Sequence, residues 1–408
     1  MSRIRRLFRS EQASGVLMIT AMLLALAAVN SPLAPIYWIF HHTPIYFRFG
    51  PLILNEPLVQ WINEGLMVFF FLLVGLEIKR QFLEGHLSTV KSAALPAFAA
   101  FGGMIVPAVI FLGFNANDPI ALKGWAIPTA TDIVLALGIL SLLGTRVPVT
   151  LKVFLTALAI FDDIGAILII GIFYGETISL LALASAALGM GALVILNAYG
   201  KYSVPLYTLI GLFLWVSLLE AGIEASLTGF LIALTIPLHG HHSSPLREAE
   251  RHLHPWCVLI VVPLFAFFNA GISIGSDTLA LLVNPVSLGI VGGLFFGKQI
   301  GVIGASYIAV RIGLAQLPKG VNWAQLYGVA LLAGIGFTMS LFIASLAFSD
   351  PTLIEASKSA IIAGSILSAI LGLSVLYMST RKRPGPTRRS QPDRRLSASE
   401  GSVRGNFD

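Results

Sequence analysis

One stretch of the chain, from Val153 to Tyr174, reads VFLTALAIFDDIGAILIIGIFY and is apolar except for two adjacent aspartates near its centre, Asp162 and Asp163. It is long enough to cross a bilayer as a helix, which requires roughly 20 residues. A charged side chain at the bilayer centre costs roughly 3 kcal/mol on the scale derived from insertion experiments. Two such charges in succession indicate a function, and an ion or proton pathway is the first hypothesis.

The composition supports a membrane setting for the whole chain. Its 408 residues are 56% hydrophobic and 11% charged, whereas soluble domains carry about 25% charged residues. The single cysteine, Cys257, excludes an intrachain disulfide and any metal site built from several cysteines. We therefore predict an all-α polytopic membrane protein, because apolar runs of this length cross a bilayer as helices.

Twelve apolar runs are candidates for transmembrane helices. The seventh and eighth are short and poorly separated, so eleven is the alternative count. No water-soluble domain fits between the runs, and residues 1–380 are predicted to form one transmembrane domain. The Arg-rich start could imitate a signal peptide cleaved near 25–27, but the first run is already near spanning length. The runs cover approximately 13–30, 58–77, 93–114, 125–143, 153–174, 178–198, 204–219, 221–238, 256–275, 286–310, 324–348 and 359–379.

The Lys and Arg residues indicate the orientation, because cytoplasmic loops carry an excess of both. With the N-terminus in the cytoplasm, 22 of the 26 Lys and Arg residues fall on the inner side. Only Arg48, Lys123 and Lys358 fall outside, and Lys298 lies within the membrane. Both termini are then cytoplasmic. This topology is a sufficient reason for the net charge of +6, and we expect no nucleic acid as a partner.

The end of the chain, residues 381–408, is rich in Arg, Pro, Ser and Gly and is predicted to be a disordered cytoplasmic tail. Its basic residues could bind anionic lipid. A topogenic and solubilising role is the simpler interpretation and the one we favour.

Three charged positions within the membrane share one depth. Asp132 lies near the centre of the fourth run, Asp162 and Asp163 near the centre of the fifth, and Lys298 near the centre of the tenth. Adjacent helical residues point roughly 100° apart, so the paired aspartates cannot both face one partner. We predict that one pairs with Lys298 and the other holds a cation. The alternative is a buried ion pair that serves packing alone.

Two runs contain helix-breaking sequences at mid-membrane, AIPTATD at 126–132 and GIGFT at 334–338. Unwound backbone at that depth is tolerated only when it is buried in protein or lines a cavity. In the predicted orientation the fourth run points inward and the eleventh outward, as in the broken helices of an inverted-topology repeat. Kinks or close packing through small residues are the alternative. We predict two broken helices that cross at the midplane and form part of a site.

These stretches resemble the bacterial NhaA-type sodium/proton antiporters. The resemblance covers approximately residues 10–380, nearly everything but the basic tail. Broken helices in inverted repeats are a known feature of that family, so they are not an independent inference. The motifs that carry the resemblance are IPTATDIVLALGIL around Thr131 and Asp132, LALAIFDDIGAILII around Asp162 and Asp163, GLFFGKQIG around Lys298, GIGFTMSLFIASLAF from Gly334, WINEGLMVFFFLLVGLEIKR from Trp61 and LHPWCVLIVVPLFAFFNAG from Leu253.

The resemblance implies a secondary active antiporter in the bacterial inner membrane, not an enzyme, with no cofactor. One sodium or lithium ion would be exchanged for protons, electrogenically and driven by the proton gradient. Asp163 would be the main cation ligand. Asp162 would be its partner in proton exchange and would pair with Lys298 when no cation is bound.

The resemblance also implies roles around the broken helices. Thr131 and Asp132 would lie where the broken ends meet. Asp132 would offset the positive N-terminal helix ends, and Lys298 would lie near the opposing negative ends.

A third group of residues is tied by the resemblance to control by cytoplasmic pH, namely Glu77, Glu250 and His254. Glu224 stands where relatives carry a histidine linked to the pH response, so the pH profile of this chain is expected to differ. Five of the eight histidines fall in one predicted cytoplasmic connection between 239 and 254. A pH sensor, a solvated loop and a metal site are the three interpretations of that cluster.

Other motifs lead to weaker alternatives. The segment 292–298 fits GxxxxGK, but Gln299 replaces the Ser or Thr of a nucleotide site and no strand precedes it. An intramembrane aspartyl protease would need two aspartates on separate helices and usually a GxGD motif, which this sequence lacks. A symporter for an organic anion is harder to exclude. It would need basic side chains or helix N-termini to contact its substrate, and Lys298 is the one buried basic residue that is evident. The pattern of segment 46–53 predicts a strand–turn–strand hairpin on the outer side. In the family such a hairpin helps form a homodimer. The expected partners are therefore a second copy of the chain and membrane lipid.

Overall fold

The computed structural model describes residues 11–49, 52–175, 179–200, 202–239, 244–275 and 278–380. The predicted cytoplasmic tail, 381–408, lies outside these ranges. So do the hairpin turn at 50–51 and the histidines at 241 and 242.

Most of the described chain is helical, because a segment inside a bilayer must satisfy its backbone polar groups internally. The first half comprises α2 (Glu11–Val29), α3 (Ala34–His42), β1 (Pro44–Phe49), β2 (Leu52–Pro57), α4 (Leu58–Gln60), η1 (Trp61–Leu66), α5 (Met67–Leu83), α6 (Val90–Asn115), η2 (Ala121–Thr129), α7 (Ile133–Ser141), η3 (Gly144–Arg146), α8 (Val149–Phe173) and α9 (Leu180–Ala198). The second half comprises α10 (Val204–Glu220), η4 (Ala225–Leu227), α11 (Thr228–Thr235), α12 (Pro245–Trp256), η5 (Cys257–Val261), α13 (Val262–Asn269), α14 (Thr278–Val283), α15 (Pro285–Gly292), η6 (Gly293–Gly297), α16 (Lys298–Arg311), α17 (Trp323–Leu332), α18 (Phe337–Ala347) and α19 (Pro351–Ser379).

Each of the twelve predicted spans corresponds to one helix or to consecutive helices, which in the fourth and eleventh spans are separated by a short break. Within the described ranges, nine helical segments are long and apolar enough to cross a membrane. The bent pair α17–α18 supplies a tenth, and α10 and η4–α11 are shorter apolar helices. The all-α polytopic fold is therefore confirmed, and the seventh and eighth spans are separate. The inverted-topology repeat stays a prediction.

The ninth span differs from its predicted bounds of 256–275. Its helix begins at Pro245, where the Ser244 side chain caps the backbone N–H of Arg247, and it ends at Asn269. Glu250 and His254 were expected in a cytoplasmic connection, but they lie on α12 instead. The polar face of this first segment is not buried in lipid, so its composition is strongly polar. The apolar run therefore did not include it, and the predicted span began too late in the chain.

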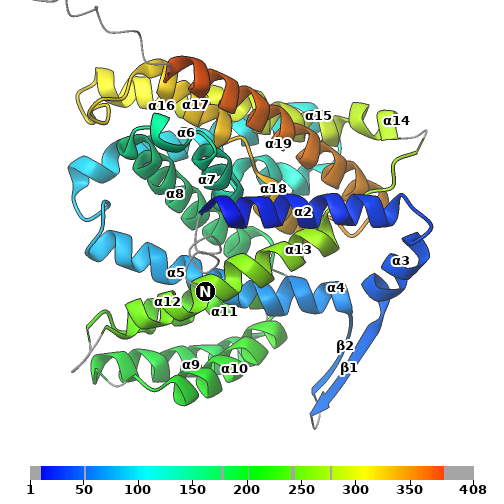
Figure 1. Ribbon diagram of the computed structural model, residues 1–408. Coiled ribbons are helices and arrows are strands. Elements are labelled where there is room, and N and C mark those ends of the chain that lie inside the picture. Colours follow the sequence, from blue (N-terminus) through cyan, green and yellow to red (C-terminus); the bar gives the residue numbers. More distant parts are fainter. Residues whose placement is uncertain are drawn as a thin grey trace, which may run out of the picture.

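Helix contacts divide the structure into two bundles (Figure 1). The first bundle contains α6, η2, α7, α8, α15, η6, α16, α17, α18 and α19. The second bundle contains η1, α5, α9, α10, η4, α11, α12, η5 and α13. Helix α2 lies between them and packs on α7 and α13, while α5 meets α8 and α13 meets α18 across the boundary.

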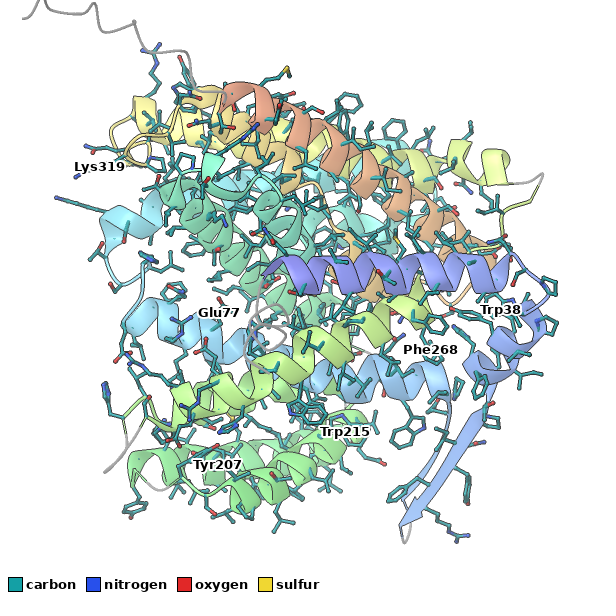
Figure 2. The ribbon with its side chains drawn as sticks, in the orientation of Figure 1. Trp38, Glu77, Tyr207, Trp215, Phe268 and Lys319 are labelled. Carbon is teal, nitrogen blue, oxygen red and sulfur yellow. The ribbon has the colours of Figure 1, made fainter. Side chains whose placement is uncertain are left out.

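The helices run between two opposite sides of the molecule, marked in Figure 2 by Lys319 and Trp38. We call the Lys319 side the inner side and the Trp38 side the outer side, following the predicted orientation. On the outer side, β1 and β2 form the predicted antiparallel hairpin, with Tyr46 opposite Asn55. The hairpin projects away from both bundles (Figure 1).

Glycines on η6 and α16 let α6 pack very closely against the tenth span. A Cβ added at Gly297 would lie 2.7 Å from the Cα of Pro107, and one added at Gly301 would lie 3.0 Å from the backbone nitrogen of Gly103. This contact places Lys298 in the protein interior with 0% exposure. The segment 292–298 is helical throughout, so the nucleotide-loop interpretation of GxxxxGK is wrong.

Candidate ion-binding site

The fourth and eleventh spans are interrupted where they cross. Backbone 130–132 lies between η2 and α7, and 333–336 lies between α17 and α18, which are bent by 43°. The two interruptions touch, because the backbone N–H of Asp132 donates to the carbonyl of Ile335 at 2.6 Å. The crossing leaves little room for a side chain at Gly336, since a Cβ there would lie 2.8 Å from Leu294 Cδ2 and 3.1 Å from the carbonyl oxygen of Ala130.

Asp132 caps the N-terminal ends of the two helices that follow the breaks, α7 and α18. Its Oδ1 accepts from the backbone N–H of Leu135 at 2.9 Å in α7. Its Oδ2 accepts from Thr338 in α18, at 3.0 Å from the backbone N–H and 2.5 Å from Oγ1. A helix N-terminus carries a partial positive charge, so one buried carboxylate here offsets two helix ends. The geometry matches the position that the resemblance implies for Asp132.

We expect Asp132→Asn to loosen the crossing. An amide has one acceptor oxygen, so it can cap α7 or α18 but not both. The loss of one charge-assisted cap should lower the free energy of unfolding by about 1–2 kcal/mol. Thermal unfolding in detergent, followed by near-ultraviolet circular dichroism, measures this change. Equal stability of the variant and the wild type would contradict the double cap.

Asp162 and Lys298 form the buried ion pair that the sequence predicted between the fifth and tenth spans. Lys298 Nζ lies 2.5 Å from Asp162 Oδ2, and both side chains have 0% exposure. Thr131 Oγ1 lies 2.5 Å from the same carboxylate oxygen and 2.7 Å from the carbonyl of Ala333. Its single proton can serve only one of these two acceptors at a time. Asp162 Oδ1 is buried and accepts no hydrogen bond from the part of the chain that the structure describes.

Asp163, the next residue along α8, is also buried in the protein interior. It has 3% exposure, and its carboxylate accepts no hydrogen bond from the described residues. Asp162 and Glu77 are the like charges that act on it most strongly. With Lys298 neutralising one carboxylate, Asp162, Asp163 and Lys298 together carry one negative charge. One net charge and several oxygen ligands suit a monovalent hard cation.

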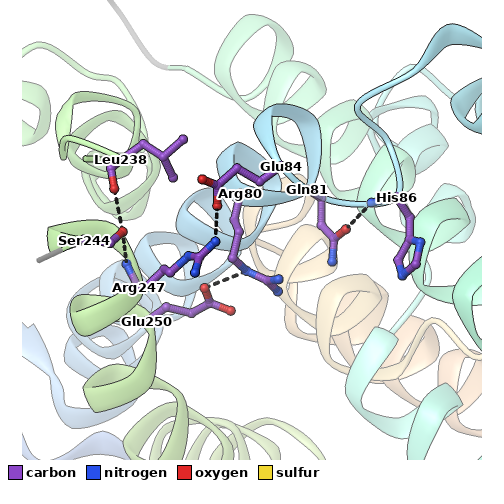
Figure 3. A network of polar contacts seen from close by, with 8 residues as sticks. All are labelled: Arg80, Gln81, Glu84, His86, Leu238, Ser244, Arg247 and Glu250. Carbon is purple, nitrogen blue, oxygen red and sulfur yellow. Dashed lines mark hydrogen bonds and ion pairs between the residues drawn. The ribbon is translucent and has the colours of Figure 1, made fainter.

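A network of ion pairs joins α5 and α12 on the inner side (Figure 3). Arg80 Nε lies 2.8 Å from Glu250 Oε2. Glu84 accepts from Arg247 at 2.5 Å and lies 3.2 Å from His239 Nε2. The hydrogen bond from Arg247 holds the pKa of the Glu84 carboxyl below its usual value. The network borders a cleft of about 700 Å³ lined by Arg80, Glu84, Arg247, Glu250, Arg251, His254 and Pro255.

The structure brings together two of the three residues tied by resemblance to pH control. Glu250 and His254 line this inner cleft. Glu77 lies on α5 one turn before Arg80, nearer the middle of the molecule (Figure 2). Glu224 belongs to a different region, because it caps η4 in the turn after α10 and accepts from the backbone N–H of Ser226 at 3.3 Å.

Sequence reasoning missed three charged residues of the inner network and one residue of the crossing. Arg80 on α5 and Glu84, the residue that directly follows this helix, stand four residues apart, and Arg247 stands three residues before Glu250 on α12. That spacing places each pair on one helix face, which is a usable signal for a charged contact. Thr338 lay inside the recognised break, but its bond to Asp132 depends on two segments that are distant in sequence.

Comparison with known proteins matches nearly the whole chain to the family that its sequence motifs resemble. Residues 5–376 match the family described as Na+/H+ antiporter 1. The Na(+)/H(+) antiporter NhaA of Rhodospirillum rubrum is 52% identical over 384 residues, which cover 91% of this chain and 96% of that protein. The protein of the same name from Shewanella sp. strain ANA-3 is 50% identical, and the match covers 90% of this chain and 96% of that protein. The one from Sulfurovum sp. strain NBC37-1 is 48% identical, and the match covers 94% of this chain and 99% of that protein. This chain therefore belongs to the Na+/H+ antiporter 1 family.

Proposed function

We propose that the protein is a secondary active antiporter that exchanges Na+ or Li+ for protons. The observation that carries the proposal is the position of Asp163 beside the Asp162–Lys298 pair, where two broken helices cross. These groups supply the oxygen ligands that a small hard cation prefers. The curated relatives, at about half identity over most of the chain, bear the same activity in their names.

The mechanism is competition for the same carboxylates. A deprotonated Asp163 can bind a bare cation, whereas a protonated one cannot. Protons and cations then exclude each other from the site. Exchange is obligatory if the protein reorients its site only when the site holds a cation or is protonated. The empty anionic form would not reorient, because an uncompensated charge is costly in the membrane interior.

Thr131 links the state of Asp162 to the number of cation ligands. When Asp162 is paired only with Lys298, the Thr131 hydroxyl can donate to it. When Asp162 turns to a cation, the same hydroxyl can donate to the carbonyl of Ala333 and keep its oxygen lone pairs for the site.

Electrogenic exchange follows if Lys298 takes part. Cation binding would draw the Asp162 carboxylate away from Lys298, and the buried ammonium could then release a proton. Together with the proton displaced from Asp163, two protons would move against one cation.

The direct test is dissipation of a pH gradient in everted vesicles or proteoliposomes. Na+ and Li+ should dissipate the gradient, while K+ and choline should not. A response to organic anions without Na+ would favour a symporter instead. A protease is disfavoured by the geometry, since Asp162 faces a lysine rather than a second aspartate.

Exchange should rise as cytoplasmic pH rises, because protons compete with the cation. Over about pH 6 to 9, the range in which histidines and raised carboxylates titrate, we expect activity to increase steadily. Glu250→Gln, which breaks the Arg80 pair, should shift this profile more than it lowers the maximum, and so should changes at Glu77 or His254.

The matched control for this profile is Glu220→Gln, an exposed carboxylate at the outer end of α10. A flat profile in the wild type would contradict the competition. Glu84 is not expected to cause the pH dependence of exchange. Its pKa is lowered in the folded protein, so its contribution to folding stability is present above its unfolded pKa of about 4.3. That contribution is lost only as the pH falls below this value.

We also propose a multi-pass protein of the bacterial inner membrane with both termini in the cytoplasm. It would act as a homodimer in contact with lipid, without a cofactor and without enzymatic activity. The hairpin supports dimerisation, because it leaves strand edges and the half-exposed side chains of Tyr46 and Phe47 outside both bundles.

A further inference from the structure

A cavity of about 820 Å³ runs along the second bundle and shares no lining residue with the inner cleft. Its walls are mostly apolar and come from the α5 span, α10, α11 and α12. Tyr207 marks its inner part and Trp215 its outer part (Figure 2). Phe69 and Leu212 also line it and are 47% and 59% exposed, so the cavity opens toward the surrounding lipid. We call it the bundle cavity.

Three polar groups at the outer end of the bundle cavity are buried. Trp61 and Trp215 lie with their ring centroids 6.4 Å apart, and neither indole nitrogen forms a hydrogen bond within the described ranges. The Thr228 hydroxyl, on a side chain that is 0% exposed, also has no partner among these residues. All three residues line the cavity. A buried unpaired donor is costly and an indole nitrogen can only donate, so these groups require a hydrogen-bond acceptor from outside the chain.

Two carboxylates flank the same end. Glu64 adjoins Gly65 on η1, and Glu224 stands four residues before Thr228; Gly65 and Thr228 both line the cavity. The elements η1 and η4 pack against each other, and Glu64 is the like charge that acts most strongly on Glu224. No Lys, Arg or His of the described residues forms an ion pair with Glu224. The Ser226 hydroxyl, beside Glu224 and 0% exposed, has no partner in the described chain either. Two neighbouring negative charges favour a bound cationic group.

We propose that the bundle cavity binds a phospholipid of the outer leaflet with a primary ammonium headgroup, of the phosphatidylethanolamine class. Its ammonium lies between Glu64 and Glu224. Its phosphate and ester oxygens accept from the indole N–H groups of Trp61 and Trp215 and from the Thr228 hydroxyl. One acyl chain lies along the apolar walls of the cavity, where its methylene groups are removed from contact with water.

Other occupants satisfy only part of this arrangement. A divalent cation would pair with the two carboxylates but would leave the indole donors without acceptors. An anionic phospholipid would bring acceptors but no group that offsets the two negative charges. A phosphatidylcholine headgroup is cationic, but its quaternary ammonium has no N–H to donate. The ammonium lipid supplies an acceptor, a cation that donates hydrogen bonds and an apolar chain together.

The first experiment compares lipids on the delipidated protein in detergent. Phosphatidylethanolamine, phosphatidylcholine, phosphatidylglycerol and cardiolipin are added separately, and bound lipid is counted by native mass spectrometry. We expect phosphatidylethanolamine to bind roughly tenfold more tightly than phosphatidylcholine and to raise the melting temperature. Glycerophosphoethanolamine, which has the same headgroup but no acyl chains, should not compete. Equal binding of phosphatidylethanolamine and phosphatidylcholine would overturn the proposal.

Carboxylate variants locate this binding. Glu224→Gln and Glu64→Gln keep the side-chain size and remove a charge, so each should weaken phosphatidylethanolamine roughly tenfold and leave phosphatidylcholine unchanged. Glu220→Gln is the matched control, because it removes an exposed carboxylate at the same outer end, on α10, and should bind like the wild type. If Glu224→Gln instead abolishes stabilisation by Mg²⁺, or weakens only an anionic lipid, the occupant is a different one and the proposal is wrong.

The second experiment uses bilayers and needs no carboxylate variant. Either phosphatidylethanolamine or phosphatidylcholine carries dibrominated acyl chains, which quench the fluorescence of a tryptophan that they contact. Subtracting the signal of Trp215→Phe isolates Trp215, and Trp323→Phe does the same for a control tryptophan on α17 in the first bundle. Brominated phosphatidylethanolamine should quench Trp215 more strongly than brominated phosphatidylcholine at the same mole fraction, while Trp323 should not distinguish them. Equal quenching of Trp215 by the two lipids would overturn the proposal, even if both carboxylate variants fail to fold.

Discussion

Asp163→Asn is expected to abolish Na+-dependent proton movement and leave the fold intact. The substitution keeps the size of the side chain but removes the charge that would bind the cation. Asp163 receives no hydrogen bond from the described residues, so no buried partner is left unpaired by the change. Dissipation of a pH gradient should fall to the level of vesicles without the protein, while the melting temperature stays close to that of the wild type.

Asp162→Asn should also cripple exchange, but with a second effect. It removes the partner of Lys298 and should therefore lower thermal stability as well. Asp350→Asn is the matched control, because Asp350 caps α19 at the outer side and asparagine caps a helix equally well. Near-normal transport by both Asp163→Asn and Asp162→Asn would remove the proposed site.

Lys298→Gln should destabilise the protein by about 3–5 kcal/mol, because it leaves the buried Asp162 carboxylate without its cationic partner. Unfolding in denaturant or by heat measures the loss. Lys298→Arg keeps a permanent positive charge that cannot titrate usefully. If the arginine variant still carries out electrogenic exchange, release of a proton from Lys298 is dispensable and the lysine only stabilises the site.

A double-mutant cycle isolates the pair. Asp162→Asn combined with Lys298→Gln removes both charges, so its destabilisation should be smaller than the sum of the two single changes. We expect a coupling energy in the upper part of the range of about 0.5–3 kcal/mol found for residues in contact. Additive effects, or unchanged stability in both Lys298 variants, would show that the two residues are not coupled.

The spans and the composition of the site followed from local sequence patterns. A run of apolar residues is costly to expose to water and cheap to place in lipid, so its length predicts a span wherever it lies in the chain. A charge inside such a run stands out for the same reason, which is why Asp132, Asp162, Asp163 and Lys298 were recognisable. The helical start of the ninth span escaped this logic, because 245–256 is polar and lies outside the apolar run.

The sequence by itself thus determined where the apolar spans lie and which charges they carry, whereas the structure decided that the seventh and eighth spans are separate. Only the tertiary structure decided which groups meet: that Asp162 rather than Asp163 pairs with Lys298, and that one carboxylate at Asp132 caps both α7 and α18. It also decided that Phe342 contacts Phe71 and Phe265 across two bundles. Burial in lipid depends on neighbours along the chain, whereas the contacts between different spans join segments that lie at least 77 residues apart, as for Phe265 and Phe342. Their partners are set by how the helices pack and rotate against one another, which no local pattern encodes.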